Sequence, residues 1–312
     1  MSIQAVAWSP NSDLWAFSNL DGILRIVNGA TGEVRFEAEL TNAGQGLAWS
    51  PDGTKLALAG GGLTVWTLET GEIDYSHDFT RPSFVTWSPD AQRLLTFEPH
   101  FVQIRDAQSG LALMDLPDFG PPVLNIAWSS DRNYLAVRTD FRTDEQPDLI
   151  VWDIAAHTPV FSQKHWSVVN NVHFTPAPDG EFLTYVRRDD ATRDHILEAW
   201  NPETDTVTEI MRGDLFSSGF SWSPDGQYFA FRGANGLSIT DTKSQTVIFQ
   251  DDHAGRDMWW SPDSTHLAYR ESEILNLYHL SSDTVQQFPY DPFYGLSVVW
   301  SPDSSYLLAY IN

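Results

Sequence analysis

The stretch GLAWSPDGTKLALAGGGLTVWTLETGE, residues 46–72, decides the fold of this 312-residue chain. Its Trp-Ser-Pro-Asp-Gly phrase returns as VTWSPDAQRL (85–94), FSWSPDGQYF (220–229), MWWSPDSTHL (258–267) and VVWSPDSSYL (298–307). Aligning the chain on this phrase gives eight anchor positions, separated by 38 to 48 residues: Trp8, Trp49, Trp87, Trp128, Phe174, Trp222, Trp260 and Trp300. An internal repeat of about this length indicates stacked supersecondary units rather than a conventional domain.

Each repeat reads as four short strands. An apolar residue stands two positions before every anchor, which predicts a strand with both side chains on one face. The Ser-Pro-Asp-Gly that follows is turn chemistry, because proline presets its own φ, aspartate bonds nearby backbone and glycine accepts positive φ. A second apolar strand begins seven residues past the anchor, as at Leu56, and in the fifth repeat Leu183 takes this place after two extra turn residues. Third and fourth strands follow, such as LTVW and EIDYS in residues 63–76.

Four short strands repeated every 40 or so residues are typical of propeller blades. From residue 3 to residue 312 the chain resembles the WD40-like β-propeller repeat family, specifically its bacterial Trp-Ser-Pro-Asp-Gly type. The resemblance implies an all-β propeller of four-stranded antiparallel blades. Only Trp152-Asp153 supplies the literal Trp-Asp dipeptide and no Gly-His pair opens a repeat. The His-Asp-Ser/Thr-Trp network of many family members is therefore not expected.

The ends of the chain leave the number of blades open. Seven repeats have all four strands, whereas the eighth, VVWSPDSSYLLAYIN (298–312), has two. We expect a single propeller domain over residues 1–312 and favour eight blades with a two-stranded last one. A seven-bladed ring would leave the final hairpin over, and a C-terminally incomplete chain is the third alternative.

Composition excludes several classes of function. There are 18 Lys and Arg against 42 Asp and Glu, for a formal net charge of −24, so the mean field repels nucleic acid and anionic membrane surfaces. The absence of cysteine excludes disulfides, zinc–thiolate sites and cysteine nucleophiles. The sequence shows neither a signal peptide at its start nor a run of 18 apolar residues. We expect a soluble, cytoplasmic monomer.

The sequence carries no recognisable motif for catalysis or metal binding. The nearest text to a Gly-x-Ser-x-Gly nucleophile elbow, GFSWSPDG from Gly219, lies in a propeller strand, and there is no phosphate-binding loop. The acidic segments RRDDATRDH (187–195) and DDH (251–253) match neither EF-hand nor His-Glu-x-x-His spacing. The aspartates that follow the anchors are spread one per repeat, so they are assigned to turns. We therefore expect no metal, no cofactor and no catalytic residue.

Binding is predicted on the loops that join second to third and fourth to first strands, because loops on rigid scaffolds carry function. The two longest such loops belong to consecutive repeats, at 138–148 and 187–195, and aromatic residues flank them on the same face. Arginines and aromatics are typical anchors of protein interfaces. The candidate partner-binding residues are Arg138, Arg142, Asp144, Trp166, Arg187, Arg188, Arg193, Phe216, Phe293 and Tyr294.

The resulting hypothesis is a non-enzymatic propeller that acts as a scaffold, presenting its loop-bearing face to a protein or peptide. The alternative is an accessory or gating propeller of a peptidase or other hydrolase whose catalytic domain lies outside these residues. A weaker third option is an enzyme with a small-ligand or metal site in the channel, which convergent histidines and carboxylates at its mouth would favour.

Overall fold

A computed structural model of the chain describes residues 3–40, 44, 46–78, 84–97, 101–116, 123–129, 131, 133–139, 147–163, 173–177, 180–189, 191–192, 194–213, 220–233, 236–252, 257–290 and 295–311. For residues 173–177, 180, 181, 188, 213 and 311 it describes the backbone only. The chain forms two compact units, Met1–Val123 with Tyr294–Asn312, and Leu124–Phe293, and each is described by itself.

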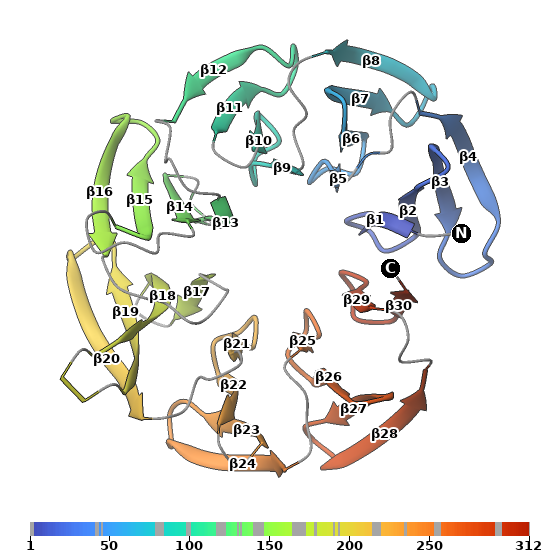
Figure 1. Ribbon diagram of the computed structural model, residues 1–312. Helices are drawn as coiled ribbons and strands as arrows, with labels where there is room; N and C mark the ends of the chain where they lie inside the picture. Colours follow the sequence, from blue (N-terminus) through green and yellow to red (C-terminus); the bar gives the residue numbers. More distant parts are fainter. Residues whose placement is uncertain are drawn as a thin grey trace. The chain divides into compact units, whose positions relative to one another are not determined.

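The first unit holds three four-stranded sheets and one two-stranded sheet among its described residues, each with strands paired in chain order (Figure 1). The first sheet contains β1 (Ile3–Trp8), β2 (Leu14–Asn19), β3 (Ile23–Asn28) and β4 (Val34–Glu39). The second contains β5 (Gly46–Trp49), β6 (Lys55–Ala59), β7 (Leu63–Thr67) and β8 (Glu72–His77). The third contains β9 (Phe84–Trp87), β10 (Arg93–Phe97), β11 (Val102–Asp106) and β12 (Ala112–Asp115). The last hairpin contains β29 (Leu296–Trp300) and β30 (Leu307–Ile311).

The second unit holds four further sheets of four strands in its described residues. The fourth sheet contains β13 (Val123–Trp128), β14 (Tyr134–Thr139), β15 (Leu149–Asp153) and β16 (Thr158–Gln163). The fifth contains β17 (His173–Ala177), β18 (Gly180–Arg188), β19 (His195–Asn201) and β20 (Thr206–Gly213). The sixth contains β21 (Phe220–Trp222), β22 (Tyr228–Gly233), β23 (Gly236–Asp241) and β24 (Thr246–Asp251), and the seventh β25 (Met258–Trp260), β26 (His266–Glu271), β27 (Ile274–His279) and β28 (Thr284–Pro289).

The predicted repeat is confirmed: seven four-stranded sheets and one two-stranded sheet appear in the described part of the chain. Seven anchors end the first strands of their sheets, while Phe174 lies inside β17. That strand runs on to Ala177, because the two extra residues lengthen the hairpin, yet Phe174 still pairs with Leu183 as Trp49 pairs with Leu56. No helix in the described ranges is long and apolar enough to cross a membrane.

A buried serine organises the turn after the anchor. Its hydroxyl donates to the Asp, or in the first repeat the Asn, two residues on, at 2.5 to 2.8 Å. The same oxygen accepts the amide N–H five residues on, at 2.9 Å in every case. These serines are 0 to 2% exposed: Ser9, Ser50, Ser88, Ser129, Ser223, Ser261 and Ser301. The assignment of the aspartates to turns is confirmed. The repeated Ser-Pro-Asp-Gly phrase forms a hydrogen-bonded turn between the first and second strands of each sheet that has this serine.

Replacing Ser301 with alanine is expected to raise the pKa of Asp303. The hydrogen bond from Ser301, followed by the N–H of Ser305, holds that pKa at about 2, below the usual value near 4. Because the folded-state pKa is the lower one, ionised Asp303 contributes stability above about pH 4 that is lost as the pH falls toward 2. NMR titration of the Asp303 carboxyl carbon measures this. Asp52, lowered first by its own Ser50, is the internal control and should not change. An Asp303 pKa that stays at the wild-type value would contradict this cause.

The core lies between sheets rather than within one. In the first unit, Ala16, Leu24 and Ile26 of the first sheet pack on Leu56 and Trp66 of the second. The first strands of the second and third sheets approach so closely that a Cβ on Gly46 would lie 2.7 Å from the Cα of Phe84. A small residue at the start of β5 thus lets the second and third sheets pack closely.

The anchor indoles join neighbouring sheets with a recurring hydrogen bond. Trp49 Nε1 donates to the carbonyl oxygen of Ala7 (3.0 Å), and Trp87 Nε1 donates to that of Ala48 (3.1 Å). In the second unit, Trp260 Nε1 donates to Ser221 O (3.1 Å). In each case the acceptor immediately precedes the anchor of the previous sheet. Trp128 and Trp222 differ, because their buried Nε1 atoms have no partner among the described residues.

The last hairpin contacts the first sheet through the same kind of indole hydrogen bond. Trp8 Nε1 donates to Val299 O at 3.3 Å, and Val299 precedes the anchor Trp300. The Asp303 N–H donates to Ser12 Oγ (2.9 Å), as the Asp225 N–H donates to Ser264 Oγ (3.1 Å) in the second unit. The Trp8 and Tyr306 rings stack at 5.8 Å, and Tyr228 and Trp260 do so at 6.1 Å. β29 and β30 thus hold, relative to the first sheet, the place of a preceding blade (Figure 1).

Candidate functional site

Most of the predicted partner-binding residues fall outside the part of the chain that the structure describes. These are Arg142, Asp144, Trp166, Arg193, Phe216, Phe293 and Tyr294, and Arg188 is described only by its backbone in β18. Arg138 and Arg187 remain, and both belong to strands rather than to the loops in which they were predicted.

Arg138 is buried. It lies in β14, pairs with Leu149 of β15 and is 5% exposed. The ladder continues one residue further, where the Thr139 N–H donates to Asp148 O at 2.9 Å, so the strand extends into the predicted loop. Arg138 shares its face with Ala136 and Leu149, which pack against the fifth sheet. The prediction that Arg138 projects from a loop surface is therefore wrong.

Arg187 belongs to a polar cluster on the side of the fifth sheet that faces the fourth sheet. Its Nε donates to Glu198 Oε1 at 2.8 Å, and the two side chains are 25% and 10% exposed. Tyr185, opposite Glu198 in the ladder, is 3% exposed. Burial first, and the Glu198 carboxylate second, raise the pKa of its hydroxyl above the usual value near 10. Arg187 thus balances a buried carboxylate, which ties it to the interface between the fourth and fifth sheets.

The acidic segment after β18 is a loop held by the side chain of Asp189. Asp189 Oδ1 accepts the N–H groups of Ala191 (2.9 Å) and Thr192 (3.2 Å), and Oδ2 pairs with Arg212 at 2.8 Å. Arg212 also pairs with Glu209 at 2.8 Å, so its charge is shared between two carboxylates. Within the described ranges no three His, Asp or Glu side chains converge as metal ligands would.

An exposed aromatic group that the sequence reasoning did not select lies at the loop end of the third sheet. Phe84 begins β9, Phe97 ends β10 opposite it, and their ring centroids are 4.9 Å apart. Phe101 precedes Val102, the partner of Phe97 in β11, and so lies at the same end. Phe84 is 40% and Phe101 50% exposed. The stretch HFVQI (100–104) contains Phe101, but nothing in its local sequence indicates that this ring stays exposed. Phe84, Phe97 and Phe101 are called the aromatic cluster below.

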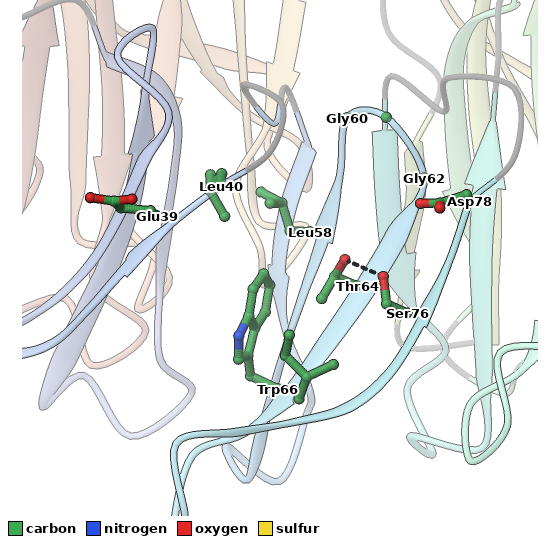
Figure 2. A pocket seen from close by; sticks show the side chains of 11 residues that line it. Glu39, Leu40, Leu58, Gly60, Gly62, Thr64, Trp66, Ser76 and Asp78 are labelled. Atoms are coloured by element: carbon green, nitrogen blue, oxygen red, sulfur yellow. Dashed lines mark hydrogen bonds between the residues drawn. The ribbon is translucent and has the colours of Figure 1, made fainter.

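A small cavity lies between the first and second sheets, near the same end. Its volume is about 170 Å³, and Leu40, Leu58 and Trp66 supply apolar walls. Figure 2 shows Thr64 and Ser76 at the side of the cavity, below Gly60 and Gly62. Their hydroxyl groups are hydrogen-bonded to each other at 3.0 Å. This volume is below the 300 Å³ or more typical of small-molecule sites.

The interface between the sixth and seventh sheets has an equivalent opening of about 600 Å³. Tyr269 occupies the position of Leu58, nine residues past its anchor, and donates its hydroxyl to Asp251 Oδ2 at 2.7 Å. Val285 occupies the position of Ile73. Both openings are lined by residues at equivalent positions of the repeat, so they are a feature of how neighbouring sheets pack.

Comparison with known proteins shows the fold. No protein-family model matches the chain, and no curated protein matches it. Among the solved structures that match is "Dihydro-heme d1 dehydrogenase NirN in complex with DHE", with a TM-score of 0.70 at 12% identity, covering 93% of this chain and 67% of that one. Similarity at this identity concerns the fold alone, so the activity named for NirN is not transferred. With the repeated sheets, it confirms that this chain is an all-β propeller.

Proposed function

We propose that this chain is a non-catalytic interaction module of the WD40-like kind, which binds a protein or peptide through the loop ends of its sheets. The observation that carries the proposal is the aromatic cluster, in which Phe84 and Phe101 keep 40% and 50% of their surface exposed. Single exposed apolar residues are ordinary, but the contacting rings of Phe84 and Phe97, with a further exposed phenylalanine at the same end of a rigid sheet, are typical of binding anchors.

The charge of the chain specifies the partner further. A formal net charge of −24 attracts cationic segments over a distance set by ionic strength. The aromatic cluster offers an apolar contact at short range. The partner that fits both is a segment with an aliphatic or aromatic residue flanked by Lys or Arg.

Selection from a random peptide library displayed on phage tests the proposal. We expect enriched peptides with an apolar residue between basic ones, and at least tenfold weaker binding to the Phe84→Ala/Phe101→Ala variant in calorimetry. The matched control is Leu111→Ala/Leu113→Ala, since these leucines at the outer side of the same sheet are 61% and 56% exposed. This control should bind like wild type.

Two results would overturn the proposal: no enrichment, or peptides that bind the Phe84→Ala/Phe101→Ala variant as tightly as wild type. The Arg142→Ala/Trp166→Ala/Arg188→Ala variant tests the surface predicted from sequence in the same assay. Loss of affinity in this variant alone would move the binding surface to the fourth and fifth repeats.

A further inference from the structure

Two histidines face each other across neighbouring strands of the seventh sheet. His266 of β26 pairs with His279 of β27 in the ladder, and their ring centroids are 4.5 Å apart. The carbonyl oxygen of His266 accepts the Ser261 N–H at 2.9 Å, on the side away from β27. The two histidines therefore form a non-hydrogen-bonded pair, in which opposite side chains approach most closely. Both imidazoles stay partly exposed.

A chain of hydrogen bonds fixes which nitrogen of His266 carries the proton. The Thr265 hydroxyl donates to Asp263 Oδ1 at 2.8 Å, which uses its single proton. The same hydroxyl oxygen lies 2.7 Å from His266 Nδ1, so it accepts a hydrogen bond from that nitrogen. Nδ1 is therefore protonated, and the lone pair of the neutral ring belongs to Nε2. A hydrogen bond at the other ring nitrogen orients metal-binding histidines in the same way.

His279 is held in a matching way. Its Nδ1 lies 2.6 Å from Ser282 Oγ, which in turn lies 2.7 Å from Thr284 Oγ1. When the Ser282 hydroxyl donates to Thr284, it accepts from Nδ1 of His279, and the lone pair of this ring also belongs to Nε2.

The surroundings of the pair keep His266 uncharged at neutral pH. Burial first, and the nearby His279 second, lower the pKa of His266 below the usual value near 6.5, against the opposing effect of Asp263. The neutral imidazole is the form that binds metal ions. Two neutral rings thus stand side by side with hydrogen bonds at their Nδ1 atoms.

The spacing of the two rings suits one kind of coordination. With a metal–nitrogen bond of about 2.0 to 2.1 Å, a metal ion lies about 3.2 Å from the centre of each imidazole ring that binds it. Two ring centres 4.5 Å apart then subtend an angle of about 90° at the metal. Right angles between neighbouring ligands are found in the tetragonal coordination of Cu²⁺ and Ni²⁺, whereas the tetrahedral coordination of Zn²⁺ has wider angles.

We propose that His266 and His279 bind a divalent transition-metal ion in tetragonal coordination, Cu²⁺ or Ni²⁺, through their Nε2 atoms. Water completes the coordination, since no group of three His, Asp or Glu side chains forms among the described residues. The net charge of −24 attracts the cation. The two histidines lie on different strands, so no local sequence motif marks the site. It is independent of the aromatic cluster and goes beyond the proposed function.

The test uses Cu²⁺, which nitrogen ligands bind more tightly than Ni²⁺ or Zn²⁺. With less Cu²⁺ than protein, pulsed electron paramagnetic resonance should detect two equatorial imidazoles on each copper ion. In calorimetry, His279→Gln should bind the first Cu²⁺ at least tenfold more weakly than wild type. The matched control is His157→Asn, at an exposed turn residue with φ of +58° that asparagine accepts, and it should bind like wild type.

A second arm tests the positioning role of Thr265. Thr265→Val removes the hydroxyl that fixes the tautomer of His266, so it should weaken Cu²⁺ binding about tenfold. Thr265→Ser keeps the hydroxyl and should bind like wild type. Equal affinities of these two variants would overturn the positioning role.

Three results would overturn the site itself. The first is a spectrum of the wild-type protein with at most one imidazole on each copper ion, which requires no variant to fold. The second is a His279→Gln variant that binds Cu²⁺ as tightly as wild type. The third is a His157→Asn variant that loses as much affinity as His279→Gln, because the bound copper would then not distinguish the pair from a single exposed histidine.

Discussion

Trp87→Ala is expected to lower the free energy of unfolding by about 3 to 5 kcal/mol, the range for removing a buried aromatic side chain. Trp87 is 6% exposed and packs with Leu63 and Val65 of the second sheet and Leu94 of its own. Its indole also satisfies the carbonyl oxygen of Ala48 at 3.1 Å. The substitution removes packing and hydrogen bond together, at the point where two sheets meet.

Urea denaturation followed by circular dichroism measures this effect. Trp87→Phe keeps much of the packing and leaves Ala48 O without its donor, so it should cost less, about 1 to 3 kcal/mol. Leu111→Ala, at a residue 61% exposed on the same sheet, should stay within about 0.5 kcal/mol of wild type. A Trp87→Ala chain within 1 kcal/mol of wild type would mean that the anchor does not hold the interface.

Gly236→Ala is expected to destabilise the second unit by about 2 to 4 kcal/mol, the sum of overpacking and an unfavourable backbone conformation. Gly236 has φ of +88°, and a Cβ there would overlap the carbonyl oxygen of Asp251 in the neighbouring strand β24. Backbone cannot rotate aside as a side chain can, so β23 and β24 would have to separate. Gly62 stands at the same point of the second sheet, against His77 O.

The matched control is Gly32→Ala. Gly32 has φ of +72°, but a Cβ there would meet no atom within 4 Å. Its substitution should cost only the conformational part, about 1 kcal/mol. Thermal unfolding of both variants separates the two contributions, and equal losses would show that the Asp251 contact adds nothing.

The fold could be predicted because independent signals recur in register. The anchor, the apolar residue before it and the turn after it each specify a strand end or a reversal, and Leu183 shows that an inserted pair of residues does not hide the register. The bond from Trp49 to Ala7 O could not be predicted. This hydrogen bond depends on how far one sheet is shifted, along the strand direction, relative to its neighbour, and no local sequence pattern encodes that shift.

The candidate site was harder to predict because strand ends decide which residues reach the surface. Arg138 reads as a loop residue beside Asp140 and Arg142, yet β14 continues through Thr139 and buries it. The same extension places Arg187 against Glu198. Only the pairing of β9, β10 and β11 shows that Phe84 and Phe101 lie at the same end of the third sheet. Exposure is a property of packed sheets, so sequence charge and aromaticity alone could not rank these sites.

The first sheet and the last hairpin meet as successive sheets do, and cysteine cross-linking of the two tests this contact. The chain has no cysteine, so an introduced pair is unique. The pair Ser12→Cys/Asp303→Cys marks the contact between chain ends, and Ser264→Cys/Asp225→Cys marks its equivalent in the second unit. With a short thiol cross-linker, we predict intramolecular cross-linking of both pairs at similar rates. Cross-linking of the second pair alone would contradict the claim.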